Sequence, residues 1–96
     1  MNSDDLRREA SDPGRLIEGE DPSAMDVATA KHWLLVYGQL LDTKSGLLAD
    51  LRKGMETMDP DARDEMVKTD EALLDAQVQR FANRIAFWEA RLLLAG

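Results

Sequence analysis

Two Asp-Pro pairs mark the places where helices are able to begin in this chain. Asp21-Pro22 and Asp59-Pro60 lie 38 residues apart, and each is followed within a few residues by a further aspartate. Aspartate is a favoured helix N-cap, proline suits the first helical position, and acid in the first turn complements the helix dipole. The pairs therefore predict two helices of similar length, at about residues 22–58 and 60–95.

Apolar residues recur at intervals of three and four in both segments, which places them on one face of each helix. The first stripe comprises Val27, Ala30, Leu34, Tyr37, Leu41, Leu48, Leu51, Met55 and Met58. The second comprises Val67, Leu74, Val78, Phe81, Ile85, Trp88 and Leu92. The pattern predicts an all-α fold in which residues 22–96 form a long antiparallel two-helix hairpin.

Glycines are the weak point of the first predicted helix. Gly38, Gly46 and Gly54 all fall inside it, and each costs roughly 1 kcal/mol relative to alanine in a helix interior. The segment at residues 42–46, Asp-Thr-Lys-Ser-Gly, is where we expect a kink or a break. A break there would give three helices instead of two.

The first 21 residues have a different composition from the rest of the chain. They contain Pro13, Gly14 and Gly19, and their few apolar residues are isolated among charges. Such segments bury too little surface to offset the entropy of ordering the chain. Residues 1–21 are predicted to be a flexible acidic arm, and the alternative is an arm whose Leu16-Ile17 pair docks on the helices or on a partner.

A further apolar row lies beside the stripe of the second helix, at Met66, Leu73, Phe87 and Leu94. A hairpin covers only one narrow stripe on each helix, so a monomer would leave this row in water. We expect the row to pack on a second copy of the chain. A homodimer of hairpins would be a four-helix bundle.

Arginine and aromatic residues gather at the open end of the predicted hairpin. Arg84 and Arg91 flank Trp88 at spacings that allow cation–π contact, and arginine with aromatics is typical of binding hot spots. Trp33, Tyr37, Phe81 and Trp88 lie on or beside the stripes and are assigned to the core. The candidate partner-binding residues are Phe87, Arg84, Arg91, Leu94, Leu73 and Met66.

No residue pattern indicates catalysis, a cofactor or a metal. His32 is the only histidine and there is no cysteine, so neither a zinc site nor a nucleophilic dyad can be assembled. The carboxylates lack the order of a calcium-binding loop. We therefore expect no catalytic, cofactor-binding or metal-ligating residues.

Two charged residues interrupt the apolar stripes, Lys44 in the first helix and Glu71 in the second. Lys44 is expected either to meet Glu71 or Asp75 in a polar layer or to extend outward along Leu48. A small helical-bundle enzyme with a site between Lys44, Glu71 and Arg84 is the alternative function.

The balance of 12 basic and 19 acidic residues gives a net charge of −7, which disfavours nucleic acid as a partner. The longest apolar run, Trp33 to Tyr37, is only five residues, so no membrane span is expected. A cytoplasmic location follows by default. The cysteine-free composition, rich in arginine, aspartate and alanine, resembles that of proteins from GC-rich bacteria. Together these features predict a small non-catalytic protein-interaction module, such as a regulatory adaptor or an accessory subunit of a larger bacterial assembly, whose protein partner the sequence does not identify.

Overall fold

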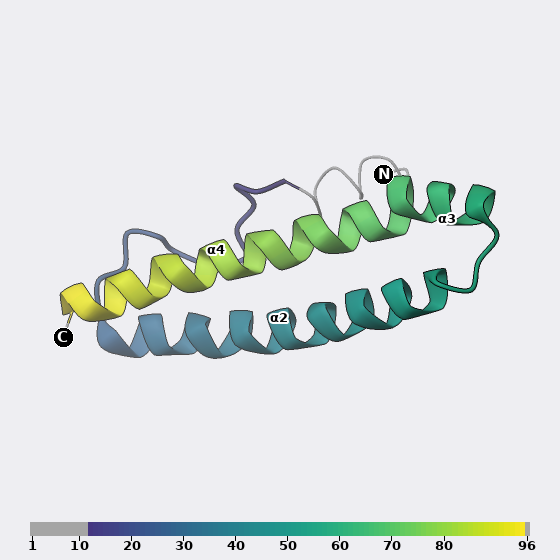
Figure 1. The fold of residues 1–96 in the computed structure, drawn as a ribbon. Coiled ribbons are helices and arrows are strands. Elements are labelled where there is room, and N and C mark those ends of the chain that lie inside the picture. Colours follow the sequence, from purple (N-terminus) through teal and green to yellow (C-terminus); the bar gives the residue numbers. More distant parts are fainter. Residues whose placement is uncertain (1–11, 96) are drawn as a thin grey trace.

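The computed structural model describes residues 12–95, and this part of the chain forms an antiparallel helical hairpin (Figure 1). Helix α2 spans Val27–Met55 and leads through a short turn to α3 (Pro60–Met66). A π-helical segment, η1 (Val67–Glu71), and α4 (Ala72–Ala95) then continue the same helical course. The predicted all-α two-helix hairpin is confirmed.

Helix α2 begins at Val27, so its predicted start at residue 22 is wrong. Asp26 is the N-cap, and its carboxylate accepts hydrogen bonds from the backbone N–H and the hydroxyl of Thr29, at 2.9 and 2.7 Å. Asp21 instead closes a local turn by accepting from the N–H and hydroxyl of Ser23. The carbonyl of Pro22 accepts from Arg91 on α4 at 2.7 Å. The second of the two local capping signals is therefore the one used, and the first lies in a turn that is bonded to α4.

The first helix is continuous through its glycines. It runs for 29 residues, so the break considered at residues 42–46 does not occur. Leu41 and Leu48, on either side of that segment, are half-buried and buried, and packing of an apolar face contributes more to a helix than local propensity does. The helix ends at Met55 rather than at residue 58. There Arg63 donates hydrogen bonds to three backbone carbonyls, those of Met55, Glu56 and Met58, at 3.0, 3.4 and 3.2 Å.

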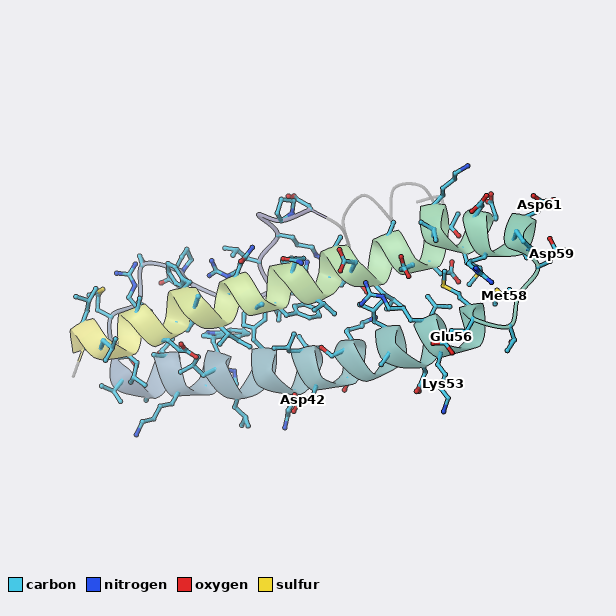
Figure 2. The ribbon with its side chains drawn as sticks, in the orientation of Figure 1. Asp42, Lys53, Glu56, Met58, Asp59 and Asp61 are labelled. Atoms are coloured by element: carbon cyan, nitrogen blue, oxygen red, sulfur yellow. The ribbon has the colours of Figure 1, made fainter. Side chains whose placement is uncertain are left out.

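The second helical course has the predicted limits. Asp59 caps it by accepting from the N–H of Asp61 at 2.9 Å, and Pro60 occupies the first helical position. Asp59 and Asp61 lie at the tip of the hairpin (Figure 2). Helical structure then continues to Ala95, in agreement with the prediction for residues 60–95.

The π segment changes which residues before it face α2. A π turn holds one more residue than an α turn, so residues N-terminal to η1 are displaced by one position in the apolar repeat. Val67 was predicted in the stripe but is 44% exposed, whereas Met66, assigned to the neighbouring row, is half-buried. The placement of Val67 is therefore corrected. The hydroxyl of Thr69 bonds the carbonyl of Glu65 at 2.8 Å in this region, a side-chain contact that competes with regular α-helical geometry.

The core is densest at the open end of the hairpin. Ala30, Trp33, Tyr37, Phe81 and Trp88 form one buried cluster, which confirms the aromatic core predicted from the stripes. Leu48 and Met55 extend it toward the tip. Within residues 12–95 no helix combines the length and the apolar character needed to cross a membrane.

Two glycines offer a matched test of this backbone. A Cβ atom at Gly46 or at Gly19 would meet nothing within 4 Å, but Gly19 has a φ of +90°. Gly46→Ala should stabilise the fold by about 1 kcal/mol, because glycine is the poorer helix former. Gly19→Ala should destabilise it by roughly 1–2 kcal/mol, because a side chain strains a left-handed backbone. Urea unfolding of both variants measures the two signs, and a destabilising Gly46→Ala would contradict a continuous α2.

A candidate binding site around a buried carboxylate

Residues 12–26, the described segment before α2, lie alongside α4 and lead into α2 (Figure 1). They include residues 12–21 of the predicted arm, and we call the whole segment the arm from here on. Ile17 and Ala24 pack against the aromatic core cluster. For residues 12–21 the docked arm therefore describes the structure better than the flexible one. Of the docking pair, Ile17 is half-buried and Leu16 is 37% exposed. The rest of the predicted arm, residues 1–11, lies outside the described residues.

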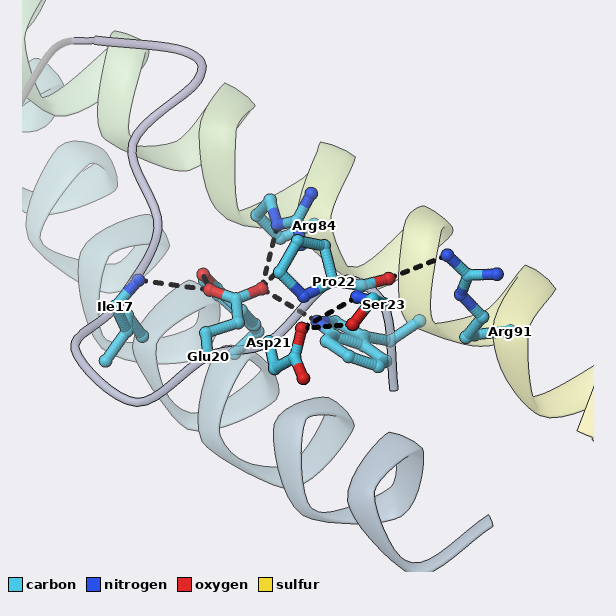
Figure 3. A network of polar contacts seen from close by, with 9 residues as sticks. Ile17, Glu20, Asp21, Pro22, Ser23, Arg84 and Arg91 are labelled. Carbon is cyan, nitrogen blue, oxygen red and sulfur yellow. Dashed lines mark hydrogen bonds and ion pairs between the residues drawn. The ribbon is translucent and has the colours of Figure 1, made fainter. Parts of the chain in front are cut away.

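Glu20 is the residue through which the arm is held. Its side chain has no exposed surface, and its carboxylate accepts hydrogen bonds from three parts of the molecule (Figure 3). Oε1 accepts from the Tyr37 hydroxyl on α2 and from the backbone N–H of Ile17, the latter at 3.0 Å. Oε2 accepts from α4: from Trp88 Nε1 at 2.8 Å and from Arg84 Nε and Nη2 at 3.0 and 2.6 Å.

This arrangement keeps Glu20 ionised inside the protein. Burial by itself would raise the pKa of the carboxyl, because the charged form loses water. The hydrogen bonds from Tyr37, Trp88 and Arg84 outweigh that effect and hold the pKa of Glu20 below its ordinary value of 4.5. Both oxygens are satisfied, as an acceptor-only carboxylate requires. The site therefore holds one negative charge against one cation and several neutral donors.

Arg84 is oriented by an aromatic ring as well as by Glu20. Its guanidinium carbon lies 4.3 Å from the centroid of the Phe87 ring, and that of Arg91 lies 5.1 Å from the same ring. The Phe87 ring also meets Trp88 edge to face at 5.0 Å. Arg91 donates to the carbonyl of Pro22 and approaches the sulfur of Met25 at 2.9 Å. Arg84 and Arg91, which were predicted to bind a partner, thus hold this chain's own arm, and Phe87, the third of these candidates, stacks against their guanidinium groups.

A second arginine is buried nearby. Arg80 is only 6% exposed, and its guanidinium lies over the Phe81 ring at 4.7 Å. Burial and the neighbouring Arg15 lower the pKa of Arg80. Its Nε has no hydrogen-bond partner among the described residues. The arm side of α4 is therefore cationic and aromatic over about three turns.

The other three predicted partner-binding residues do not belong to this site. Met66 and Leu73 are half-buried farther toward the tip. Leu94 is 72% exposed and Leu93, beside it, is 83% exposed. Of the six candidates, the structure brings together Phe87, Arg84 and Arg91 and leaves Leu94 at the surface.

The residues of the alternative enzyme site engage other partners. Glu71 pairs with Arg52 on α2 at 3.4 Å, and Asp75 lies 3.6 Å from the same arginine. Arg84 lies 13 residues beyond Glu71 in the sequence, about 20 Å away at the α-helical rise, and is bonded to Glu20. The polar layer predicted for Lys44 is thus made by Arg52 instead. Lys44 itself is half-buried.

No cluster of three or more potential metal-ligating side chains occurs within residues 12–95. Comparisons with protein-family models, with curated proteins and with solved structures gave no match. What the site can do therefore has to be inferred from its own chemistry. Its donors receive a carboxylate together with a backbone carbonyl, which Glu20 and Pro22 present from two consecutive turns of the chain.

Sequence reasoning missed Glu20 and the polar role of Tyr37. Glu20 lies in a segment crowded with acids, where a carboxylate is ordinarily solvated, and its strongest partner is 64 residues away. The only sequence signal was the Leu16-Ile17 pair three residues before it, which suggested docking. Tyr37 was recognised as a core ring, but a buried hydroxyl also requires an acceptor.

Glu20→Gln should weaken the docking of the arm without unfolding the helices. The substitution keeps the shape of the side chain but removes the charge that faces Arg84. We expect a loss of about 2 kcal/mol in the free energy of unfolding, in the range for a charge-assisted hydrogen bond, with little change in helical circular dichroism. Glu18→Gln, at an exposed position of the same arm, is the matched control. Equal stability of the two variants in urea would show that the Glu20 contacts contribute nothing.

The same groups set the pH range over which the arm is held. Because the pKa of Glu20 is lower in the folded state, its contribution is complete above the ordinary value of 4.5 and is lost as the pH falls through the folded-state pKa. Burial and Glu20 raise the pKa of Tyr37 from 10.0 to about 12, so its contribution is present below 10.0 and is lost as the pH rises toward 12. The stability difference between wild type and Glu20→Gln should shrink below pH 4.5. A difference that stays constant in acid would contradict the assignment.

Proposed function

We propose that this chain is a small non-catalytic protein-interaction module that binds through helix faces, as a regulatory adaptor or an accessory subunit does. The observation that carries the proposal is the exposure of Leu93 and Leu94, at 83% and 72%, near the C-terminal end of α4. Large apolar side chains cluster in water mainly where another surface covers them. The two leucines lie at the C-terminal end of an outer stripe of mainly small residues on α4.

That outer stripe consists of Ala82, Ala86, Ala90 and Leu93, all exposed. Intervals of four, four and three residues align them along one side of the helix. Residues 82 and 86 lie roughly 120° and 160° around the helix from Trp88, which faces the core. Small side chains allow another helix to approach closely, and the two leucines supply the area for a contact. The stripe is therefore suited to packing against a helix.

A second copy of the chain is the simplest occupant. A two-fold contact uses the same surface on both partners, so the outer stripe would pack on its own counterpart. Two hairpins joined in this way make a four-helix bundle. The acidic tip would then extend away from the contact, since eight acids and only two bases lie between Glu56 and Asp75 and like charges repel.

The test is a double substitution with a matched control. Leu93→Ser with Leu94→Ser should weaken self-association at micromolar concentration by about 2 kcal/mol, roughly thirtyfold in Kd, if the pair behaves as a hot spot. Leu35→Ser, on α2 at 61% exposure, should leave it unchanged. Sedimentation equilibrium measures both, and circular dichroism checks the fold. Two results together would refute the proposal. The wild type would be monomeric, and the set of proteins that co-purify with it would be unchanged by the double substitution.

A further inference from the structure

The arm is attached to the hairpin at few points. Among residues 12–26 only Glu20 is buried, and only Ile17 and Ala24 are half-buried. Hydrogen bonds between this segment and the helices converge on the Glu20 carboxylate and the Pro22 carbonyl, with Arg91 also approaching Met25. Segments with few buried contacts open locally without global unfolding. The arm is therefore the part of the described chain most able to detach while the helices stay folded.

The groups that hold Glu20 are positioned by the hairpin rather than by the arm. Tyr37 and Trp88 are fully buried in the core cluster, and Arg84 is stacked on Phe87 at 4.3 Å. We call Tyr37, Arg84 and Trp88 the carboxylate receptor. Arg91 lies about one helical turn beyond Trp88 on α4. It donates a hydrogen bond to the backbone carbonyl of Pro22, two residues after Glu20. Side chains held in place before a ligand arrives bind it at lower entropic cost.

The charge around the receptor selects for an acidic ligand. The chain has a net charge of −7, yet residues 76–96 contain three arginines and one glutamate. An acidic segment is therefore attracted to this end of the molecule and repelled by the tip. An Arg-aromatic surface of this kind is typical of hot spots, and among residues 12–95 it is the segment before α2 that covers it.

We propose that the carboxylate receptor binds a glutamate-containing turn segment of another protein, and that the chain's own arm, which forms turns at 17–20 and 21–24, is the built-in competitor for that site. The arm shows the pattern such a segment needs. Its apolar residue is Ile17, its glutamate is Glu20 three positions later, and two positions after that the carbonyl of Pro22 is available to Arg91. The receptor is separate from the outer stripe, because Arg84 and Ala86 lie about 160° apart around α4. This inference therefore stands apart from the proposed self-association.

Competition follows from the geometry of attachment. The tethered arm is present at a high effective concentration, so a free segment binds only in proportion to the fraction of molecules in which the arm is detached. A second protein that contacts the molecule elsewhere would bring its own acidic segment to a similar effective concentration. Binding of that protein's acidic segment at the receptor, which displaces the arm, would then depend on its contact elsewhere on the molecule.

The first experiment uses a labelled peptide of residues 12–26 and the full-length Glu20→Gln protein, whose own arm competes poorly. Fluorescence anisotropy should show saturable binding at least about tenfold tighter than to the wild type. The same peptide with Gln at position 20 should bind at least about tenfold more weakly, which is one charge-assisted hydrogen bond. Arg52→Gln combined with Glu20→Gln, which removes an arginine near the tip, should leave binding unchanged. No saturable binding to the folded variant, or equal binding of both peptides, would overturn the proposal.

The second experiment uses the wild type and does not depend on any variant folding. Native-state hydrogen exchange should show the amides of Ile17 and Glu20, which are hydrogen-bonded within the arm at 3.0 and 2.9 Å, exchanging at least about tenfold faster than the amides at the centre of α4. Equal protection would mean that the arm leaves only when the whole protein unfolds, and would overturn the proposal.

A further outcome concerns the source of the segment. A concentration-dependent dimer that is lost in Glu20→Gln would assign the receptor to the arm of a second copy, and would overturn the assignment to a different protein.

Discussion

A carboxylate that is buried stays ionised only if hydrogen-bond donors replace the water it has lost. The side chains around Glu20, at the open end of the hairpin, meet that requirement. Tyr37 and Trp88 combine a buried ring with a polar atom, so each packs in the core and donates to the carboxylate. Arg84 supplies the balancing charge and is held by Phe87. A buried ion pair adds little stability in itself. Its effect here is to fix the path of the arm.

The helices could be predicted from the sequence wherever local and tertiary signals agree. At Asp59-Pro60 no competing cap lies nearby, and the predicted start is the observed one. At Asp21-Pro22 a second cap, Asp26, lies five residues on and begins the observed helix, while the carbonyl of Pro22 is bonded to Arg91 on α4. The π segment shifts Val67 out of the stripe by a single inserted residue. Neither effect is visible in periodicity, because both depend on how one helix meets another part of the chain.

In the candidate site, too, some residues could be predicted from local spacing and one could not. Arg84, Phe87 and Arg91 were identified because helical spacing alone brings them together. Glu20 was not, because its partners lie 17, 64 and 68 residues away and only the hairpin places them side by side. What the aromatic and arginine residues bind could therefore not be read from their own helix. Composition indicated a binding surface, and the fold supplied its first occupant.

Helix α4 presents three sides with different chemistry, and this division limits how the molecule can be used. The side with Phe81 and Trp88 is committed to the core, because opening it would expose the largest buried rings. The side with Arg84 and Arg91 is polar and is bonded to the arm, and long charged side chains of this kind tolerate water. The side with Ala86 and Leu93 is mainly small and apolar, with exposed Asn83 and Glu89 at its margins, and its apolar surface gains by being covered. Surfaces of opposite character thus lie on one helix, so the proposed self-association and the proposed binding of an acidic segment would use different residues.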